Sequence, residues 1–336
     1  MKKCLAMLMI LCILVSFSGC GSPGAQSAGP VDGERPGEAG QAGEEKPSFP
    51  EKAITLIIPV AAGSGADIHG RKLASIAEKY LGQPIIVENI AGGNQAVGTV
   101  AMLNREADGY TVCQTSPSLC TLFMAENAPF KREDLQPIAA FNAEPNGFTV
   151  RGDSGFETMR DVIDYAIANP KSLKIGSSGS GSNQHLTIEL LAKRAGFEYT
   201  YIPYDGGKDA VLALMGKNVD AIGVTPANGS AQYDSGEFRL LAVSGEERME
   251  KYPDAVSYAE LGYDVSVINW RGILANKDVP ADIAAILEDA FLRAAEDPEF
   301  IKFNEENGQL SGYLKNAEEF GELIDQTTEA FLEVSQ

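Results

Sequence analysis

The sequence predicts an α/β protein of about two domains, and three observations carry this prediction. The chain has 336 residues, of which 44% are hydrophobic and 22% are charged, so it can bury cores of ordinary globular composition. Short apolar runs rich in β-branched residues alternate with longer stretches of helical periodicity. Such alternation is typical of a parallel sheet with right-handed helical crossovers. The alternation begins only near residue 53, after two N-terminal stretches of different composition.

Residues 1–19 are typical of a bacterial lipoprotein signal. Lys2 and Lys3 precede an apolar run over residues 5–15, which is shorter than the roughly 20 residues that a membrane-spanning helix needs. The residues before Cys20 resemble a lipobox, with the order Phe17-Ser18-Gly19-Cys20. We therefore expect cleavage before Cys20 and lipidation of this cysteine. The alternative is an ordinary cleaved signal followed by an unrelated cysteine.

Residues 20–50 predict a disordered tether. They are rich in Gly, Ser, Pro, Ala and Glu and contain almost no large apolar side chain, so they cannot bury a core. A tether that follows a lipidated Cys20 predicts an exported protein, anchored by lipid to the cell membrane and facing the periplasm or the exterior.

The first half of the globular part predicts three strands and two helices. Residues 54–60 form a nearly continuous apolar run, as expected for a strand that is covered on both faces. A stretch with apolar residues at helical spacing follows and ends at Gly82. The remaining predicted elements are a strand at 84–88, a helix at 94–105 and a strand at 110–115.

The same alternation starts again after residue 150. Predicted helices cover residues 157–168, 184–195 and 208–215, and predicted strands cover 173–176, 199–204, 219–224 and 238–243. A strand at 273–275 and three helices near 281–295, 298–307 and 316–334 complete the chain.

Charge and cysteine content exclude several classes of protein. With 47 acidic and 27 basic residues the net charge is −20, which excludes a nucleic-acid binder because phosphates would be repelled. The chain has two histidines and no Cys-x-x-Cys pair, so we expect no metal and no cofactor. Two alternatives are open for Cys113 and Cys120. They form a disulfide, which an exported location permits, or they remain two buried thiols.

Two turns rich in glycine and serine, each between a strand and a helix, carry the predicted chemistry. In the first, Ser64 precedes Asp67 by three residues, which predicts a capping box and a helix that begins near Gly65. The second runs from Gly176 to His185. Glycines let a ligand approach the backbone closely, and the free amides of a helix start attract a negative group. Each turn is therefore a candidate cradle for a carboxylate, at the strand ends where α/β sheets bind ligands.

Enzymatic alternatives depend on the same turns. A serine hydrolase would use Ser178 or Ser180 with His185, but the motif Gly-x-Ser-x-Gly is absent. The P-loop motif is also absent, and the dinucleotide-like Gly63-Ser64-Gly65 lacks its third glycine. We therefore expect a protein that is not an enzyme, with the exported hydrolase as the alternative.

Several segments, in order along the chain, resemble the solute receptors of tripartite tricarboxylate transporters, also called the Bug family. The likeness extends from about residue 49 to the C-terminus. The segments that carry it are residues 49–67, 81–89, 107–111, 176–186, 202–207, 239–244 and 270–275.

The resemblance implies a type II periplasmic-binding-protein fold, in which two α/β lobes joined by a hinge close over a small carboxylate. Lobe 1 would comprise residues 51–149 plus 269–336, and lobe 2 residues 150–268. The implied partners are this solute and the membrane permease subunits of a tripartite transporter. A receptor that signals to a sensor kinase instead of feeding a permease is the alternative.

The resemblance also implies ligand-binding residues. These are Ala62, Gly63, Ser64, Gly65, Ala66 and Asp67 in the first turn, and Ser178, Gly179, Ser180, Ser182 and His185 in the second, with Ser116, Tyr204 and Thr225 as further candidates for the same cleft.

Structural roles compete with ligand contact at several of these positions. Asp67 is expected to cap its helix and to pair with Arg71, four residues on. His185 has an equal claim to be a packed, hydrogen-bonded residue, and packing is the favoured role of Tyr204 and Trp270. At residues 224–228 the chain lacks the Phe-Asp pair of many family members, so an acidic ligand contact is expected to be lost there.

Overall fold

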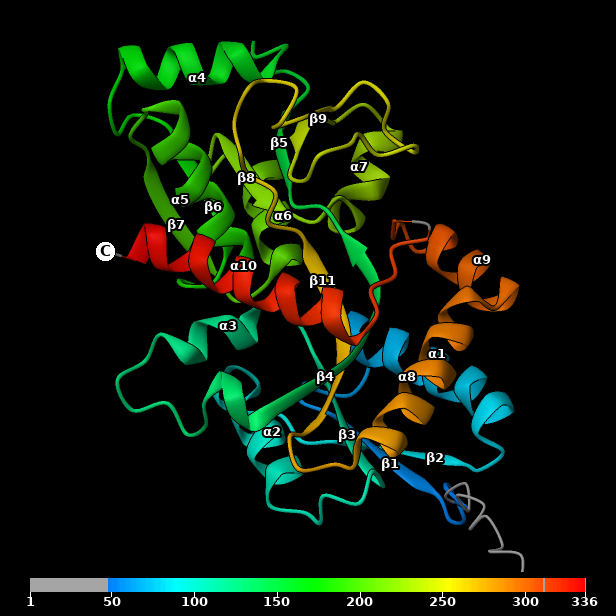
Figure 1. The fold of residues 1–336 in the computed structure, drawn as a ribbon. Coiled ribbons are helices and arrows are strands. Elements are labelled where there is room, and N and C mark those ends of the chain that lie inside the picture. Colours follow the sequence, from blue (N-terminus) through cyan, green and yellow to red (C-terminus); the bar gives the residue numbers. More distant parts are fainter. Residues whose placement is uncertain (1–47, 311, 336) are drawn as a thin grey trace, which may run out of the picture. The chain divides into compact units, whose positions relative to one another are not determined.

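The computed structural model describes residues 48–310 and 312–335. They belong to one compact unit that contains two β-sheets with helices packed against them (Figure 1). The predicted signal segment, the tether as far as residue 47 and Cys20 lie outside the described residues. Within the described part, no helix combines the length and the apolar character needed to cross a membrane.

The first sheet orders its strands β2-β1-β3-β11-β4. Strand β1 pairs in parallel with β2 and β3, whereas β11 runs antiparallel to β3 and β4. The strands are β1 (Ile54–Ile58), β2 (Ile85–Asn89), β3 (Thr111–Thr115), β4 (Leu135–Glu144) and β11 (Asn269–Asn276). The helices from the same parts of the chain are α1 (Gly65–Leu81), α2 (Ala96–Leu103), α3 (Ser118–Phe123), α8 (Ala281–Glu296), α9 (Pro298–Glu306) and α10 (Ala317–Ser335).

The second sheet orders its strands β10-β9-β5-β8-β6-β7. Strand β5 runs antiparallel to β8 and β9, and the other pairs are parallel. The strands are β5 (Gly147–Arg151), β6 (Lys174–Ser178), β7 (Thr200–Tyr204), β8 (Ala221–Val224), β9 (Phe238–Val243) and β10 (Val256–Ser257). The helices between them are α4 (Met159–Ala168), α5 (Asn183–Ala195), α6 (Gly207–Met215) and α7 (Ser230–Asp234).

The predicted α/β class is confirmed, but the expectation of purely parallel sheets is wrong. Strand β11 runs against the other strands of the first sheet and β5 against those of the second, and the chain passes between the sheets from β4 to β5 and again before β11. Strand β4 ends at Glu144 and β5 begins at Gly147, so Pro145 and Asn146 alone connect them. The sequence pattern predicted neither β4 nor β5, because Pro137 interrupts β4 and its apolar residues do not alternate.

The apolar run of β1 explains why this strand lies inside the first sheet. Ile57 packs into one hydrophobic cluster, while Leu56 and Ile58 pack into another. All three side chains are fully buried. Because successive side chains of a strand point to opposite faces, helices must cover the sheet on both sides, as the sequence predicted for this run.

The C-terminal helix α10 contacts elements from both sheets. Trp270 on β11 is fully buried, and its indole nitrogen donates to Thr327 Oγ1 of α10 at 3.1 Å. Farther along α10, Glu333 accepts from Arg194 of α5 at 2.7 Å. Figure 1 shows α10 passing from the side of β4 and β11 toward α5. Trp270 is thus a packing residue, as expected.

Cys113 and Cys120 are two free, buried thiols rather than a disulfide. Burial raises the pKa of each thiol to about 12, so neither is a reactive thiolate at neutral pH.

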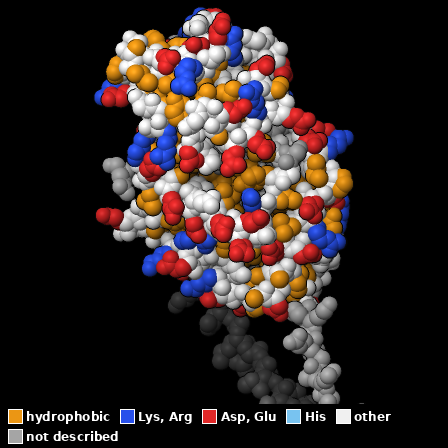
Figure 2. Space-filling model, turned by 45° about the horizontal axis from the view of Figure 1, so that its top comes forward, with side chains coloured by type: hydrophobic (Ala, Val, Ile, Leu, Met, Phe, Trp, Pro, Cys, Tyr) orange, Lys and Arg blue, Asp and Glu red, His pale blue; other side chains and the backbone are white. Residues whose placement is uncertain are grey.

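Acidic side chains are dispersed on one face of the molecule. On the face shown in Figure 2, Asp and Glu lie among Lys, Arg and apolar groups rather than in a single cluster. The net charge of −20 therefore acts as a diffuse field, which salt screens over about 10 Å at 0.1 M ionic strength.

Candidate functional site

The two glycine turns share one backbone geometry. Each follows the carboxyl end of a strand and begins a helix, the first between β1 and α1 and the second between β6 and α5. In each, a glycine with left-handed φ precedes the serine that caps the helix. Gly63 has φ 78° and Gly181 has φ 76°, and both capping serines, Ser64 and Ser182, are extended. Only glycine adopts this φ without strain.

In the first turn, Asp67 closes the loop. Its backbone amide donates to Ser64 Oγ at 3.3 Å, and its carboxylate accepts the amide of Gly63 at 2.8 Å. The helix begins at Gly65, as predicted. The predicted capping box is incomplete, because it requires the Asp67 carboxylate to accept the amide of the capping residue Ser64, and the carboxylate accepts the amide of Gly63 instead. The next two amides, of Gly65 and Ala66, donate to no group among the described residues.

The second turn repeats this arrangement with a histidine in place of the aspartate. The His185 amide donates to Ser182 Oγ at 3.2 Å, and His185 Nδ1 accepts the amide of Gly181 at 3.1 Å. The amides of Asn183 and Gln184 again find no acceptor within the part of the chain that the structure describes. Each turn therefore presents two free amides at the positive end of a helix dipole, which is the arrangement that binds carboxylates.

Asp67 has a structural role. Its carboxylate also accepts from Arg71 at 2.9 Å and from Asn89 at 2.8 Å, and the side chain is buried. Burial raises the pKa of Asp67, but the hydrogen bonds from Gly63, Asn89 and Arg71 together outweigh this effect and hold the pKa below its usual value. The expected ion pair with Arg71 is present, whereas Ser64 supplies the cap and the Asp67 carboxylate bonds Gly63, which precedes the helix.

His185 also acts as a support of its turn. While Nδ1 accepts from Gly181, Nε2 lies 3.2 Å from Glu189 Oε1, and the ring stacks on Tyr201 with centroids 3.8 Å apart. Both ring nitrogens are therefore engaged. Ser178 Oγ donates to Gln184 Oε1 at 3.0 Å instead of to the histidine, and Ser180 is exposed. This arrangement lacks the serine-to-histidine contact that a hydrolase needs.

A third loop, which the sequence pattern did not reveal, lies beside Ser116. Four consecutive residues, Gly92 to Gln95, have positive φ. The sequence predicted a helix that begins at residue 94, but helix α2 begins at Ala96 because of this loop. The buried Gln95 side chain donates to Ser116 Oγ at 2.7 Å and accepts the Ser116 amide at 3.2 Å. Ser116 is thus tied to the loop that follows β2.

The last two candidates lie in the part of the chain that forms the second sheet. Thr225 is buried, and its Oγ1 accepts from Asn228 at 2.7 Å. The Tyr204 ring lies against the backbone of Gly176, where an added Cβ would stand 2.9 Å from the ring. Packing on Gly176 fits the expected role of Tyr204. Asn228 had no sequence signal of its own.

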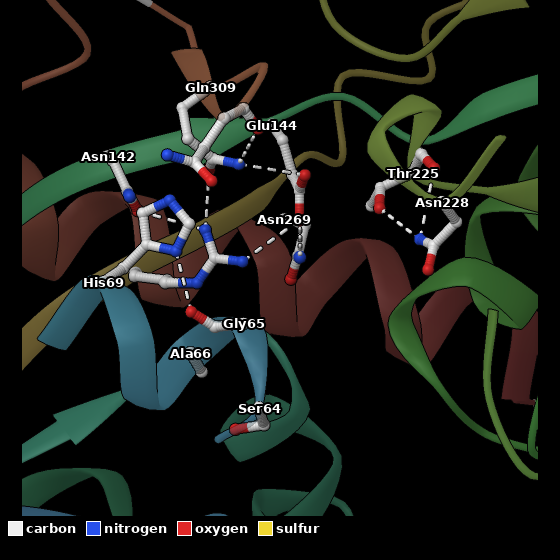
Figure 3. A network of polar contacts seen from close by, with 12 residues as sticks. Ser64, Gly65, Ala66, His69, Asn142, Glu144, Thr225, Asn228, Asn269 and Gln309 are labelled. Carbon is white, nitrogen blue, oxygen red and sulfur yellow. Dashed lines mark hydrogen bonds and ion pairs between the residues drawn. The ribbon is translucent and has the colours of Figure 1, made fainter. Parts of the chain in front are cut away.

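A buried ion pair joins β4, which leads out of the first sheet, to β11, which leads back into it. Arg271 on β11 donates to Glu144 on β4 at 3.1 Å, and the two side chains are each 7% exposed. Gln309 bonds both partners, accepting from Arg271 at 2.7 Å and donating to Glu144 at 3.1 Å. Asn142 and Asn269 complete the network. In Figure 3, Glu144 and Asn269 lie between the start of α1 and the Thr225–Asn228 pair.

His69 connects this network to the first turn. Its Nδ1 lies 2.7 Å from the carbonyl of Gly65, so this nitrogen carries the proton of the neutral ring. Burial, with the nearby Arg271 guanidinium, lowers the pKa of His69 to about 4. The ring therefore stays neutral at physiological pH, and Figure 3 shows it between Gly65 and Asn142. Among the described residues, no cluster of His, Cys, Asp and Glu fits a metal ion.

Replacing Asp67 by asparagine should destabilise the protein in a pH-dependent way. The pKa of Asp67 is lowered in the folded state, so its contribution is present above the unfolded value and is lost as pH falls through the folded value. We expect urea unfolding to give Asp67→Asn a deficit of about 2 kcal/mol at pH 7, which shrinks at pH 3. Asp164→Asn, at an exposed position of α4, serves as control. An equal deficit at both pH values would contradict this role of the carboxylate.

The hydrogen bonds of His185 predict that the protein has no esterase activity. Purified wild type should hydrolyse p-nitrophenyl acetate no faster than Ser178→Ala or His185→Ala, because both nitrogens of the histidine already have partners. Turnover that is present in wild type and lost in both variants would instead support a hydrolase.

Three comparisons place the chain among known proteins. It matches the family described as "Tripartite tricarboxylate transporter family receptor" over residues 70–333. A UPF0065 protein of Cupriavidus necator is 33% identical over 284 residues, which is 83% of this chain and 85% of the relative. BugT of Bordetella pertussis is 31% identical and covers 71% of this chain and 75% of its own length. The crystal structure of a TctC solute binding protein from Polaromonas, without ligand, has a TM-score of 0.78 at 28% identity and covers 85% of this chain and 99% of that one.

These matches confirm the resemblance and the two-lobed α/β fold. They also confirm that the protein is not an enzyme, since the family consists of extracytoplasmic solute receptors. On the strength of the family match and of relatives that are more than 30% identical over most of the chain, this protein belongs to the tripartite tricarboxylate transporter receptor family.

Proposed function

We propose that the two glycine turns grip one small carboxylate between two lobes, and that the receptor delivers this solute to the membrane permease subunits of a tripartite tricarboxylate transporter. The observation that carries the proposal is the repeated helix start, with two free amides at Gly65 and Ala66 and two more at Asn183 and Gln184. A carboxylate has two oxygens that accept such bonds, and charge-assisted bonds to backbone amides are strong.

Short-range donors outweigh the overall charge in this site. The net charge of −20 repels an anion at long range, but salt screens this field over about 10 Å at 0.1 M. The converging amides act at contact distance, where helix dipoles and backbone donors favour the anion. A receptor with an acidic surface can therefore bind an acid at an amide-lined site.

The lobes would be residues 51–149 plus 269–336 and residues 150–268, with the hinge where the chain passes between the sheets. The Glu144–Arg271 pair supports this position, because it fixes the last residues of β4 against the first residues of β11. Closure of the lobes would then change the backbone angles of the residues just beyond the pair, such as Pro145 and Asn146. Hinge closure over a ligand is a general way in which a receptor signals occupancy to a partner.

The N-terminal sequence supports attachment to the membrane. Cleavage after residue 19 and lipidation of Cys20 would leave residues 20–50 as a tether that keeps the receptor near the permease. The proposed location is therefore the outer face of the cell membrane, in the periplasm or at the exterior.

A bulky side chain at Gly65 should block the first cradle. An added Cβ at Gly65 meets no atom within 4 Å, so Gly65→Leu should fold normally but cover the free amides. Calorimetric titration with mono-, di- and tricarboxylates should show at least about tenfold weaker binding of the acid that wild type prefers. Unchanged affinity in Gly65→Leu would contradict the proposed grip.

Gly206→Leu is the matched control for this variant. Gly206 caps α6 after the edge strand β7, and the nearest atom to its added Cβ is Asp209 Oδ2 at 4.0 Å. The control should bind the acid like wild type. Failure of wild type itself to bind any organic acid would refute the receptor function.

Removing Cys20 tests the membrane anchor. In cells that process lipoproteins, wild type should partition into the detergent phase of Triton X-114, because acyl chains supply the membrane affinity. Cys20→Ser should partition into the aqueous phase. A Cys20→Ser variant that stays in the detergent phase would show that another segment anchors the protein.

A further inference from the structure

The two turns are closed by side chains that respond differently to protons. The Asp67 carboxylate accepts the amide of Gly63 in the first turn, and His185 Nδ1 accepts the amide of Gly181 in the second. The pKa of Asp67 lies below its usual value, so this acceptor persists in mildly acidic solution. A neutral imidazole accepts through one nitrogen only, and a second proton removes that acceptor.

The contacts of His185 fix the position of its first proton. Since Nδ1 accepts the Gly181 amide at 3.1 Å, the neutral ring carries its proton on Nε2, which lies 3.2 Å from Glu189 Oε1. The Tyr199 hydroxyl donates to the same carboxylate oxygen at 2.7 Å and orients it. The ring also packs on Tyr201. These partners together present Nδ1 to Gly181 as an acceptor.

Glu189 supplies the charge that faces the ring. Its hydrogen bond with His185, together with that of Tyr199, outweighs burial and lowers the pKa of Glu189, so this partner is an anion. Burial raises the pKa of Tyr199 and of Tyr201 on β7, so both hydroxyls stay neutral.

The other elements around the start of α5 bring no such charge to the ring. Residues 176–184 of the turn are Gly, Ser, Asn and Gln, and β8 contains no titratable residue. Lys174 stands at the end of β6 that is opposite to the turn. On α10, Glu333 pairs with Arg194, farther along α5.

A second proton on His185 must go to Nδ1, because Nε2 already carries one. Two donors, the ring nitrogen and the Gly181 amide, would then face each other at 3.1 Å, where no hydrogen bond can form. The ring is restrained, since protonation strengthens its ion pair with Glu189 and Tyr201 packs on its face. The movement therefore falls on Gly181, whose φ of 76° sets the direction of the capping Ser182 and of the free amides that follow.

The positive charge gained by the ring does not replace this geometry. By itself it would attract a carboxylate, but it lies 3.2 Å from the Glu189 carboxylate, so the two side chains together present no net charge to a solute. Backbone donors bind an anion only at contact distance and in the right direction. Loss of the turn geometry therefore outweighs the attraction.

We propose that His185 makes solute binding depend on pH, because protonation at Nδ1 releases Gly181 and opens the second turn while Asp67 keeps the first one closed. This inference rests on the proposed function, since it needs a solute that both turns hold. Affinity is full where the ring is neutral and falls as pH decreases through the range in which histidines titrate, about 5 to 8. The other histidine of the chain takes no part, because burial lowers the pKa of His69 to about 4.

The test measures affinity at two pH values and the protons exchanged on binding. Acetate, succinate and citrate are titrated calorimetrically into the detergent-solubilised full chain at pH 8 and pH 5.5, in buffers of different ionisation enthalpy. The probe that binds best should bind wild type about tenfold more weakly at pH 5.5. Because a bound solute favours the neutral ring, binding between these pH values should release protons.

His185→Asn separates the response of the ring from that of the probe. The carboxamide oxygen can accept the Gly181 amide as the Asp67 carboxylate accepts that of Gly63, and a carboxamide does not titrate. The ratio of its affinities at the two pH values therefore reports the protonation of the probe alone. Whatever the absolute affinity of this variant, its ratio should be much closer to one than that of wild type.

Glu189→Gln tests the charge that faces the ring, and Glu198→Gln is the matched control. A glutamine no longer stabilises the doubly protonated ring, so the loss of affinity should begin at a lower pH than in wild type. Glu198 is exposed and pairs with Lys171 beyond the end of α5, so its variant should follow wild type. This pair of variants tests the proposal even where His185→Asn binds weakly.

The outcomes separate the two proposals. If wild type binds equally well at both pH values or more tightly at pH 5.5, or if His185→Asn shows the same loss as wild type, the pH dependence through His185 is overturned while the carboxylate receptor stands. If wild type binds none of the three probes and no other carboxylate at either pH, both proposals fall.

Discussion

The start of a helix leaves amides without acceptors, and the rest of this structure depends on how that constraint is met. At α1 and at α5, a serine satisfies one amide and the side chain three residues later turns back to bond the preceding glycine. Two amides stay free in each case. Any substitution that bends these turns would redirect the free amides, so the hydrogen bonds that hold the turns also fix the direction of these amides.

The two turns solve the same problem with different chemistry. Asp67 brings a negative charge close to the first helix start, and its carboxylate accepts hydrogen bonds from three donors, Gly63, Arg71 and Asn89. His185 makes the same closure with a ring nitrogen, since its Nδ1 accepts a hydrogen bond from Gly181 and its Nε2 faces Glu189. The two turns therefore have the same geometry but different electrostatics. The side chain that closes the first turn accepts three hydrogen bonds, whereas the ring that closes the second has two polar contacts.

The sequence predicted the fold class, most helices and both turns, because these depend on local patterns. The apolar run at residues 54–58, the serine caps and the stop at Gly82 are all local signals. It did not predict β4 and β5, whose burial arises from the antiparallel passage between two sheets. The loop at Gly92 to Gln95 was also missed, since the positive φ of Asn94 and Gln95 accompanies side-chain bonds to residues more than 20 positions away, in Ser116, Ser118 and Thr121. The Glu144–Arg271 pair has no sequence signature, because its partners are 127 residues apart.

The position of α10 has a mechanical consequence. Its middle is held by the buried contact of Thr327 with Trp270, and its end adds the buried Phe331 and the partly exposed pair of Glu333 with Arg194 of α5. Buried aromatic contacts are costly to break, but an exposed ion pair contributes only about 0–1 kcal/mol. The helix is therefore joined to both parts of the molecule by buried apolar contacts, and the ion pair adds a contact that higher ionic strength weakens.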